Sequence, residues 1–132
     1  MDNDNRDPDG YTPDDIVDRL HRTVQNGVYG IDYTVNPGDK EQKLRDEYIV
    51  DDNLIAKILC SLRKENWKYY EFSNKKGREK DIVHFFEISY LLRPRLKEEA
   101  HEESVVLYIK ITWAKPDNNL FVISFHEDGL FD

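Results

Sequence analysis

The sequence has few of the residues that build covalent or metal-stabilised folds. Its 132 residues include one cysteine, Cys60, which excludes an internal disulfide and any zinc site made from several cysteines. No apolar run approaches the ~18 residues that a membrane span requires. The first residues carry acids where a secretory signal would carry bases. We therefore expect a cytoplasmic protein that has no membrane partner.

Motifs that bind metals, nucleotides or acyl groups are also missing. There is no glycine-rich phosphate loop and no Gly-x-Ser-x-Gly, and the four histidines do not have metal-ligand spacing. His84 lies in an apolar strand pattern, which is more typical of a hydrogen-bonded core histidine. Cys60 lies among aliphatic residues and is expected to be part of the core rather than a nucleophile. We expect neither a metal nor a cofactor.

Basic residues are too few to balance the acidic ones, and the formal net charge is −8. Residues 1–52 hold 14 acids and 6 bases, whereas residues 53–132 hold 13 of each. Residues 57–80 hold 8 bases and 3 acids. A local basic patch guides a polyanion more than net charge does, because salt screens exposed charges beyond about 8 Å. The alternative is that these bases only solvate a helix end and a turn.

The pattern along the chain predicts one α+β domain over residues 12–132, after a disordered acidic tail over residues 1–11. N-terminal helices are expected to pack on a four-stranded, mainly antiparallel sheet. Thr12 and Asp51 or Asp52 are suitable helix N-caps. The expected helices are 12–27, a weak one at 40–48, and 52–65; the expected strands are a short one within 28–35, then 67–73, 82–92, 104–114 and 120–126.

The last two strands contain the candidate chemistry. Alternation places Val105, Leu107, Ile109, Ile111 and Trp113 on a core face, and Val106, Tyr108, Lys110 and Thr112 on the opposite face. Metal-free RNA cleavage needs proton-transfer groups and cations around the phosphate. Residues of suitable type that the sheet could bring together are Lys68, Arg93, Arg95, Tyr108, Lys110 and His126. An ordinary solvated sheet face would give the same pattern.

This hairpin resembles the terminal motif of the MqsR-type toxins. The resemblance covers roughly residues 50–128, and its most specific part is the pair of segments 107–112 (LYIKIT) and 122–127 (VISFHE). It implies a RelE-like fold and a ribosome-independent, messenger-RNA-cleaving ribonuclease of a bacterial toxin–antitoxin pair. It also implies a catalytic role for Tyr108, with Lys110 as the strand lysine. His126 falls where some members have lysine, and Lys68 is the base nearest to the family's active-site lysine.

We therefore expect a metal-independent endoribonuclease that acts on single-stranded RNA and is blocked by a cognate antitoxin. Tyr108, His126 and Lys68 are the expected catalytic residues, and Lys110, Arg93 and Arg95 the expected RNA-binding residues. The alternative is a non-enzymatic acidic binding module, such as an immunity or antitoxin-like protein, that covers a basic partner. A third reading places the acidic N-terminal segment over residues 57–80 as an internal mimic of RNA.

Overall fold

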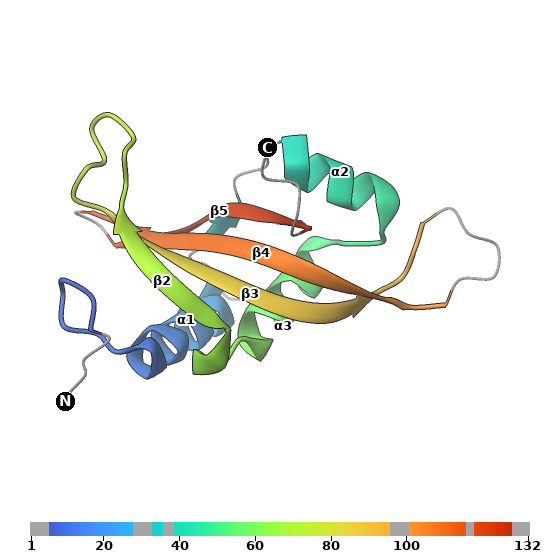
Figure 1. The fold of residues 1–132 in the computed structure, drawn as a ribbon, viewed down its shortest axis with the longest axis horizontal. Coiled ribbons are helices and arrows are strands. Elements are labelled where there is room, and N and C mark those ends of the chain that lie inside the picture. The colour runs from blue at the N-terminus through green and yellow to red at the C-terminus, as the bar shows by residue number, and fades with distance from the viewer. Residues whose placement is uncertain (1–5, 28–32, 36–38, 96–100, 116–117, 128–132) are drawn as a thin grey trace.

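The computed structural model describes residues 6–27, 33–35, 39–95, 101–115 and 118–127. In chain order these form α1 (Pro13–Gly27), β1 (Tyr33–Val35), α2 (Asp39–Glu47), α3 (Asp52–Ser61), a 3₁₀ turn (Lys64–Asn66), β2 (Trp67–Phe72), β3 (Ile82–Leu92), β4 (Glu103–Ala114) and β5 (Asn119–Glu127) (Figure 1). The predicted α+β class is confirmed.

The sheet has the strand order β1-β5-β4-β3-β2. Strands β2 to β5 form the expected antiparallel meander, and β1 adds a fifth strand parallel to β5. Of the short strand predicted within 28–35, the structure describes residues 33–35; residues 28–32 lie outside the described part. Between β3 and β4, residues 96–100 also lie outside the described part.

Capping side chains fix the starts of α1 and α3. The Thr12 hydroxyl accepts a hydrogen bond from the Asp15 amide (3.2 Å), and the Asp15 carboxylate accepts one from the Thr12 amide (3.0 Å). The Asp51 carboxylate accepts a hydrogen bond from the Leu54 amide at 2.8 Å. Both caps agree with the sequence pattern, which placed these helix starts within one residue.

The end of α3 differs from the prediction. The helix was expected to reach residue 65, but it stops at Ser61 because Leu62 adopts an extended conformation and is fully buried. A 3₁₀ turn follows, in which the Asn66 side-chain oxygen accepts the amide hydrogen of Arg63 (2.8 Å). This turn redirects the chain into β2.

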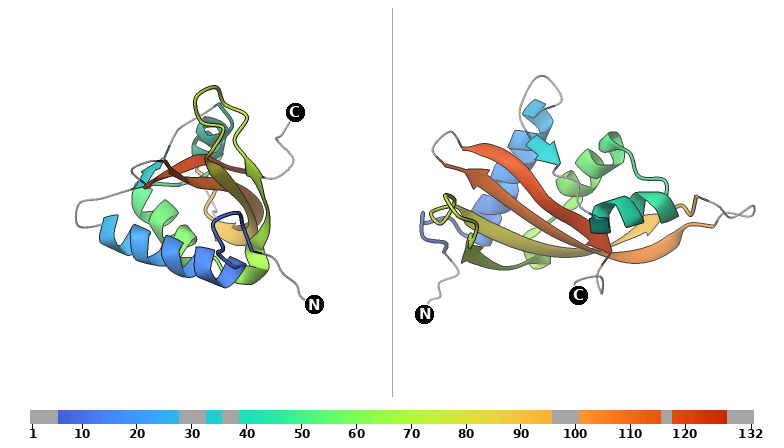
Figure 2. Two further views of the ribbon diagram at one scale, coloured as in Figure 1. Left: turned by 90° about the vertical axis from the view of Figure 1, so that its left-hand side faces the viewer. Right: turned by 90° about the horizontal axis from the view of Figure 1, so that it is seen from above.

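The hydrophobic core lies between the sheet and the pair α1 and α3. Figure 2 shows these two helices on one side of the sheet, with α2 and the long β2–β3 loop on the other. The helices contribute buried residues such as Leu20 and Ile58. The predicted core face of β4 is confirmed: Val105, Leu107, Ile109, Ile111 and Trp113 are all buried. The opposite face of β4 therefore points away from α1 and α3.

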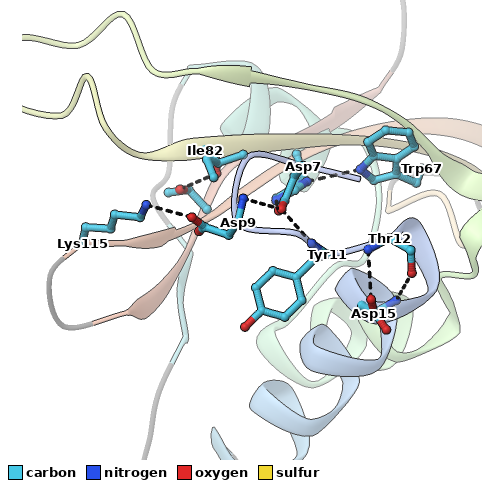
Figure 3. A network of polar contacts seen from close by, with 10 residues as sticks. Asp7, Asp9, Tyr11, Thr12, Asp15, Trp67, Ile82 and Lys115 are labelled. Atoms are coloured by element: carbon cyan, nitrogen blue, oxygen red, sulfur yellow. Dashed lines mark hydrogen bonds and ion pairs between the residues drawn. The ribbon is translucent and has the colours of Figure 1, made fainter. Parts of the chain in front are cut away.

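The N-terminal segment corrects one prediction. Residues 1–11 were expected to be disordered, but residues 6–11 form a hydrogen-bonded turn beside the start of α1; residues 1–5 lie outside the described part. The buried Asp7 carboxylate accepts the amide hydrogens of Asp9 and Tyr11, both at 2.9 Å (Figure 3). Asp9 also lies 3.4 Å from the Lys115 ammonium. Composition suggested disorder, whereas these contacts with distant residues fix the turn.

Candidate functional site

Strand register aligns three polar side chains across the middle of the sheet. Glu87 on β3 pairs with Tyr108 on β4, and Tyr108 pairs with His126 on β5. The neighbouring row on the same face consists of Phe85, Lys110 and Ser124. The geometry therefore brings together three of the six predicted site residues, Tyr108, Lys110 and His126, on the face turned away from α1 and α3.

Tyr108 is the centre of this group. Its ring centroid lies 5.4 Å from that of His126 and 5.9 Å from that of Phe85. Its hydroxyl oxygen lies 3.4 Å from the hydroxyl of Tyr69 on β2. The Tyr108 side chain is half-buried. It is thus fixed by neighbours on three other strands while part of it still meets solvent.

Lys110 lies in the next row and packs over aromatic rings. Its ammonium is 5.3 Å from the Phe85 ring centroid and 5.9 Å from that of Tyr108. Tyr69 stacks on Phe85, with centroids 4.3 Å apart and planes 10° from parallel. These rings hold the cation within reach of the phenol.

Lys68 reaches the edge of the group through an ion pair. Its ammonium lies 3.8 Å from the Glu87 carboxylate. A register shift between Trp67 and Tyr69 marks a bulge at Lys68, which changes the direction of that side chain relative to regular alternation. Glu87 was not selected from the sequence, although a carboxylate on an otherwise apolar strand was the available signal.

His126 adjoins Tyr108 but is hidden. Only 3% of the residue is exposed, and its Nδ1 lies 2.9 Å from the carbonyl oxygen of Glu127. A carbonyl can only accept, so Nδ1 carries a proton in this contact. His126 is on β5, the strand against which α2 packs. Alternation left open whether the Phe125 face or the His126 face of β5 adjoins Tyr108, and it did not predict burial, so we correct the expectation that this ring lies on the open surface.

Arg93 and Arg95 do not join the group, which corrects the expectation of one shared patch. Arg93 follows the end of β3, six residues from Glu87, a separation of ~20 Å along an extended strand. Arg95 donates its side-chain hydrogens to the carbonyls of Arg45 (2.9 Å) and Tyr48 (3.3 Å). It therefore holds the end of α2, far from the phenol.

A hollow of about 530 Å³ opens on the same face, between the β2–β3 turn and strands β4 and β5. Its wall includes Phe72, Phe85 and Phe121, and Lys110 is also part of it. Lys110 therefore joins the hollow to the Tyr108 group. The sequence did not predict this hollow, because its walls come from four strands whose spacing depends on sheet twist.

The described residues offer neither a metal-binding cluster nor an activated thiol. Within residues 6–27, 33–35, 39–95, 101–115 and 118–127, no cluster of three or more His, Cys, Asp or Glu could hold a metal ion. Burial raises the pKa of the Cys60 thiol, which disfavours the reactive thiolate. None of the described helices is both long and apolar enough to cross a bilayer.

These observations define an α+β protein that gathers a carboxylate, a phenol, an imidazole and an ammonium group on the sheet face opposite α1 and α3. Comparisons with known protein families, with curated proteins and with solved structures found no match to this chain.

Proposed function

We propose that this protein is a metal-independent endoribonuclease that cleaves single-stranded RNA. The observation that carries the proposal is the row Glu87, Tyr108 and His126, with Lys110 beside it, on the sheet face opposite α1 and α3. These are the groups that metal-free phosphodiester cleavage needs. The resemblance of the terminal hairpin to the MqsR-type toxins and their RelE-like fold supports the same reading.

The row supplies a proton acceptor and a proton donor on neighbouring strands, whose backbones are ~4.8 Å apart. We place the scissile phosphate between the Glu87 carboxylate and the Tyr108 hydroxyl. Glu87 would accept the proton of the attacking 2′-hydroxyl on one side, and Tyr108 would donate a proton to the departing 5′-oxygen on the other, leaving a 2′,3′-cyclic phosphate and a 5′-hydroxyl.

The remaining groups assist this step. Lys110, next to the phenol, would stabilise the negative charge of the pentacovalent phosphorane. Lys68, whose ammonium lies 3.8 Å from the Glu87 carboxylate, would hold that carboxylate beside Tyr108. His126 is buried, so we assign it to positioning the Tyr108 ring rather than to contact with RNA.

The expected protein partner is a cognate antitoxin that covers this face. The resemblance to toxins of toxin–antitoxin pairs supports this partner, and the open face offers it a surface. On this proposal, the antitoxin would block Tyr108 and Lys110 from RNA.

The test uses purified protein and a single-stranded RNA in EDTA. We expect cleavage, and we expect Tyr108→Phe to lower the rate by about 100-fold or more, because proton-transfer groups contribute about 10²–10⁴-fold. Tyr70→Phe is the matched control: Tyr70 pairs with His84 in register and follows Tyr69 on the other side of β2. Equal cleavage by wild type and Tyr108→Phe would refute the proposal.

A second candidate function follows from the charge distribution. With a net charge of −8 concentrated in residues 1–52, the chain could instead cover a basic partner as a non-enzymatic binding module. Expression in cells separates the two functions. A ribonuclease should arrest growth unless Tyr108 is substituted, whereas a binding module should co-purify with a basic protein and leave RNA intact.

A further inference from the structure

A second row of side chains crosses the sheet next to the row that contains Tyr108. From β5 to β2, strand register aligns Ser124, Lys110, Phe85 and Tyr69. The rings of Phe85 and Tyr69 stack with their centroids 4.3 Å apart, close to the ~4.8 Å between neighbouring strands. Because their planes are only 10° from parallel, each ring turns one face toward the next strand and the other face away from it.

The Tyr69 ring has one covered face and one that points off the edge of the sheet. Phe85 covers the inner face. Strand β2 is the last in the sheet order, so no described strand lies beyond the outer face (Figure 1). Tyr69 is 43% exposed, a large fraction for an aromatic residue within a strand. The row therefore ends in an aromatic surface at the place that a further strand would fill.

This surface adjoins the proposed cleavage site. The hydroxyl oxygen of Tyr69 lies 3.4 Å from that of Tyr108. Lys68 precedes Tyr69 in β2, and its side chain is 46% exposed while its ammonium lies 3.8 Å from the Glu87 carboxylate. A ligand on the outer face of Tyr69 would thus lie beside a cation and next to the groups to which we assign the proton transfers.

The charge of this edge favours a polyanion. Residues 57–80 include the turn before β2, the whole of β2 and most of the loop that follows it, and they hold 8 bases and 3 acids. A single-stranded nucleic acid supplies a flat ring and a negative charge with each nucleotide. Proteins bind such strands by combining positive charge with aromatic side chains on which the bases stack.

We propose that the outer face of Tyr69 stacks on an unpaired nucleobase of the RNA, in a nucleotide that flanks the cleaved bond. The base would extend the stack of Phe85 and Tyr69 by one ring, and Lys68 would lie near an adjoining phosphate. The assignment rests on the proposed ribonuclease function and adds the residue by which the enzyme holds its substrate. Stacking tolerates any base, so Tyr69 would contribute affinity more than sequence preference.

The test measures binding of a single strand that cannot be cleaved. The probe is a ten-residue 2′-O-methyl RNA with a 5′-fluorescein, which lacks the attacking hydroxyl, and binding is followed by fluorescence anisotropy. We expect Tyr69→Ala to weaken binding about 5- to 100-fold, the contribution of one stacked base. Tyr69→Phe should bind within twofold of wild type, because it keeps the ring and loses only the hydroxyl.

Phe72→Ala is the matched control. Phe72 is 54% exposed on the same strand, but it pairs with Ile82, and register turns its ring to the opposite side of β2 from Tyr69. Phe72→Ala should bind within twofold of wild type. The assignment is overturned if Tyr69→Ala also binds within twofold. It is equally overturned if both alanine variants lose the same affinity, because a weakened edge strand would then explain the loss.

A second probe reports stacking directly. It carries one 2-aminopurine between uridines, and the fluorescence of this base falls when it stacks on an aromatic ring. Saturating wild type or Tyr69→Phe should quench it, whereas saturating Tyr69→Ala should not. Equal quenching by all three proteins contradicts the assignment.

The two proposals fail in different ways. Loss of probe affinity in Tyr69→Ala without any cleavage of natural RNA by wild type would sustain the stacked base and refute the ribonuclease. Cleavage that depends on Tyr108 but has an unchanged KM in Tyr69→Ala would sustain the ribonuclease and refute the stacked base.

Discussion

His84 shows how a single side chain can link distant parts of the fold. Its Nδ1 accepts the indole hydrogen of Trp67 at 3.2 Å, so the proton of the neutral ring lies on Nε2, 3.5 Å from the Asp7 carboxylate. Burial and, to a smaller extent, the charge of Arg19 lower the pKa of His84 to about 4, against a smaller opposing effect of Asp9. The structure thus confirms the expectation of a hydrogen-bonded core histidine and adds its contact with the N-terminal turn.

The lowered pKa of His84 predicts a loss of stability in acid. Between pH 6.5 and 4 the unfolded chain binds a proton that the folded protein excludes, so the free energy of unfolding falls as pH falls through this window. At about 1.4 kcal/mol per pKa unit, this contribution amounts to about 2 kcal/mol between pH 7 and pH 4.5. His84→Gln should remove this part of the acid dependence, as measured by urea unfolding at the two pH values.

His101→Gln is the control for this experiment, since His101 is exposed. It should retain the full acid dependence of wild type. If His84→Gln and wild type lose the same stability between pH 7 and pH 4.5, His84 is not held neutral in the folded protein, and the prediction is contradicted.

At the scale of elements, α2 depends on the end of β3. The Arg95 amide donates to the carbonyl of Glu47 at 2.9 Å, and the Arg95 side chain donates to two more carbonyls at the end of this helix. Such carbonyls lack partners within a helix. Tyr48 forms a β-bridge with Pro94 in the same region. In turn α2 packs against β5, the strand that carries His126.

Arg95→Ala should therefore lower stability and leave RNA binding intact. We expect a loss of about 1 kcal/mol in the free energy of unfolding, the usual size for exposed hydrogen bonds to backbone. Affinity for a single-stranded 2′-O-methyl RNA, which lacks the attacking hydroxyl and cannot be cleaved, should stay within twofold of wild type. Arg93→Ala, a neighbouring arginine variant, serves as the comparison. If Arg95→Ala instead loses RNA affinity strongly while its stability is unchanged, Arg95 binds RNA, as the sequence analysis expected.

The elements themselves were largely predictable, whereas their environment was not. Period-two alternation in β4 is strong enough to define which residues face the core, and capping patterns placed the starts of α1 and α3. Alternation says nothing about what covers a face, so the burial of His126 could not be foreseen. The parallel pairing of β1 with β5 and the separation of Arg93 from Tyr108 are likewise consequences of tertiary contacts.

On the scale of the whole molecule, the acidic N-terminal turn contacts one end of the fold. Beyond the turn, the Asp7 carboxylate lies beside His84 and that of Asp9 beside Lys115, both outside the basic segment 57–80. The acid that does pair with this segment is Asp14 in α1, 3.8 Å from Lys64. Arg19 packs over Tyr11 and Trp113, at 5.3 and 4.2 Å from their ring centroids, and joins the turn to α1 and β4. These contacts favour a structural role for the turn over mimicry of RNA.

Deletion of residues 1–11 tests this role. It would remove the partner of the buried His84 and bring the formal net charge from −8 to −5, because the segment holds four acids and one base. We expect the Tm to fall by about 5 °C, since 1 kcal/mol corresponds to a few degrees in a domain of this size. Asp7→Asn, which keeps the chain intact, should reproduce part of this fall in Tm.

RNA affinity should change by less than twofold in both variants. The reason is that Asp7 contacts His84 on the core-facing side of β3, whereas the Tyr108 group lies on the opposite side of the sheet. A rise of fivefold or more in the deletion variant alone would show instead that the acidic segment competes with RNA.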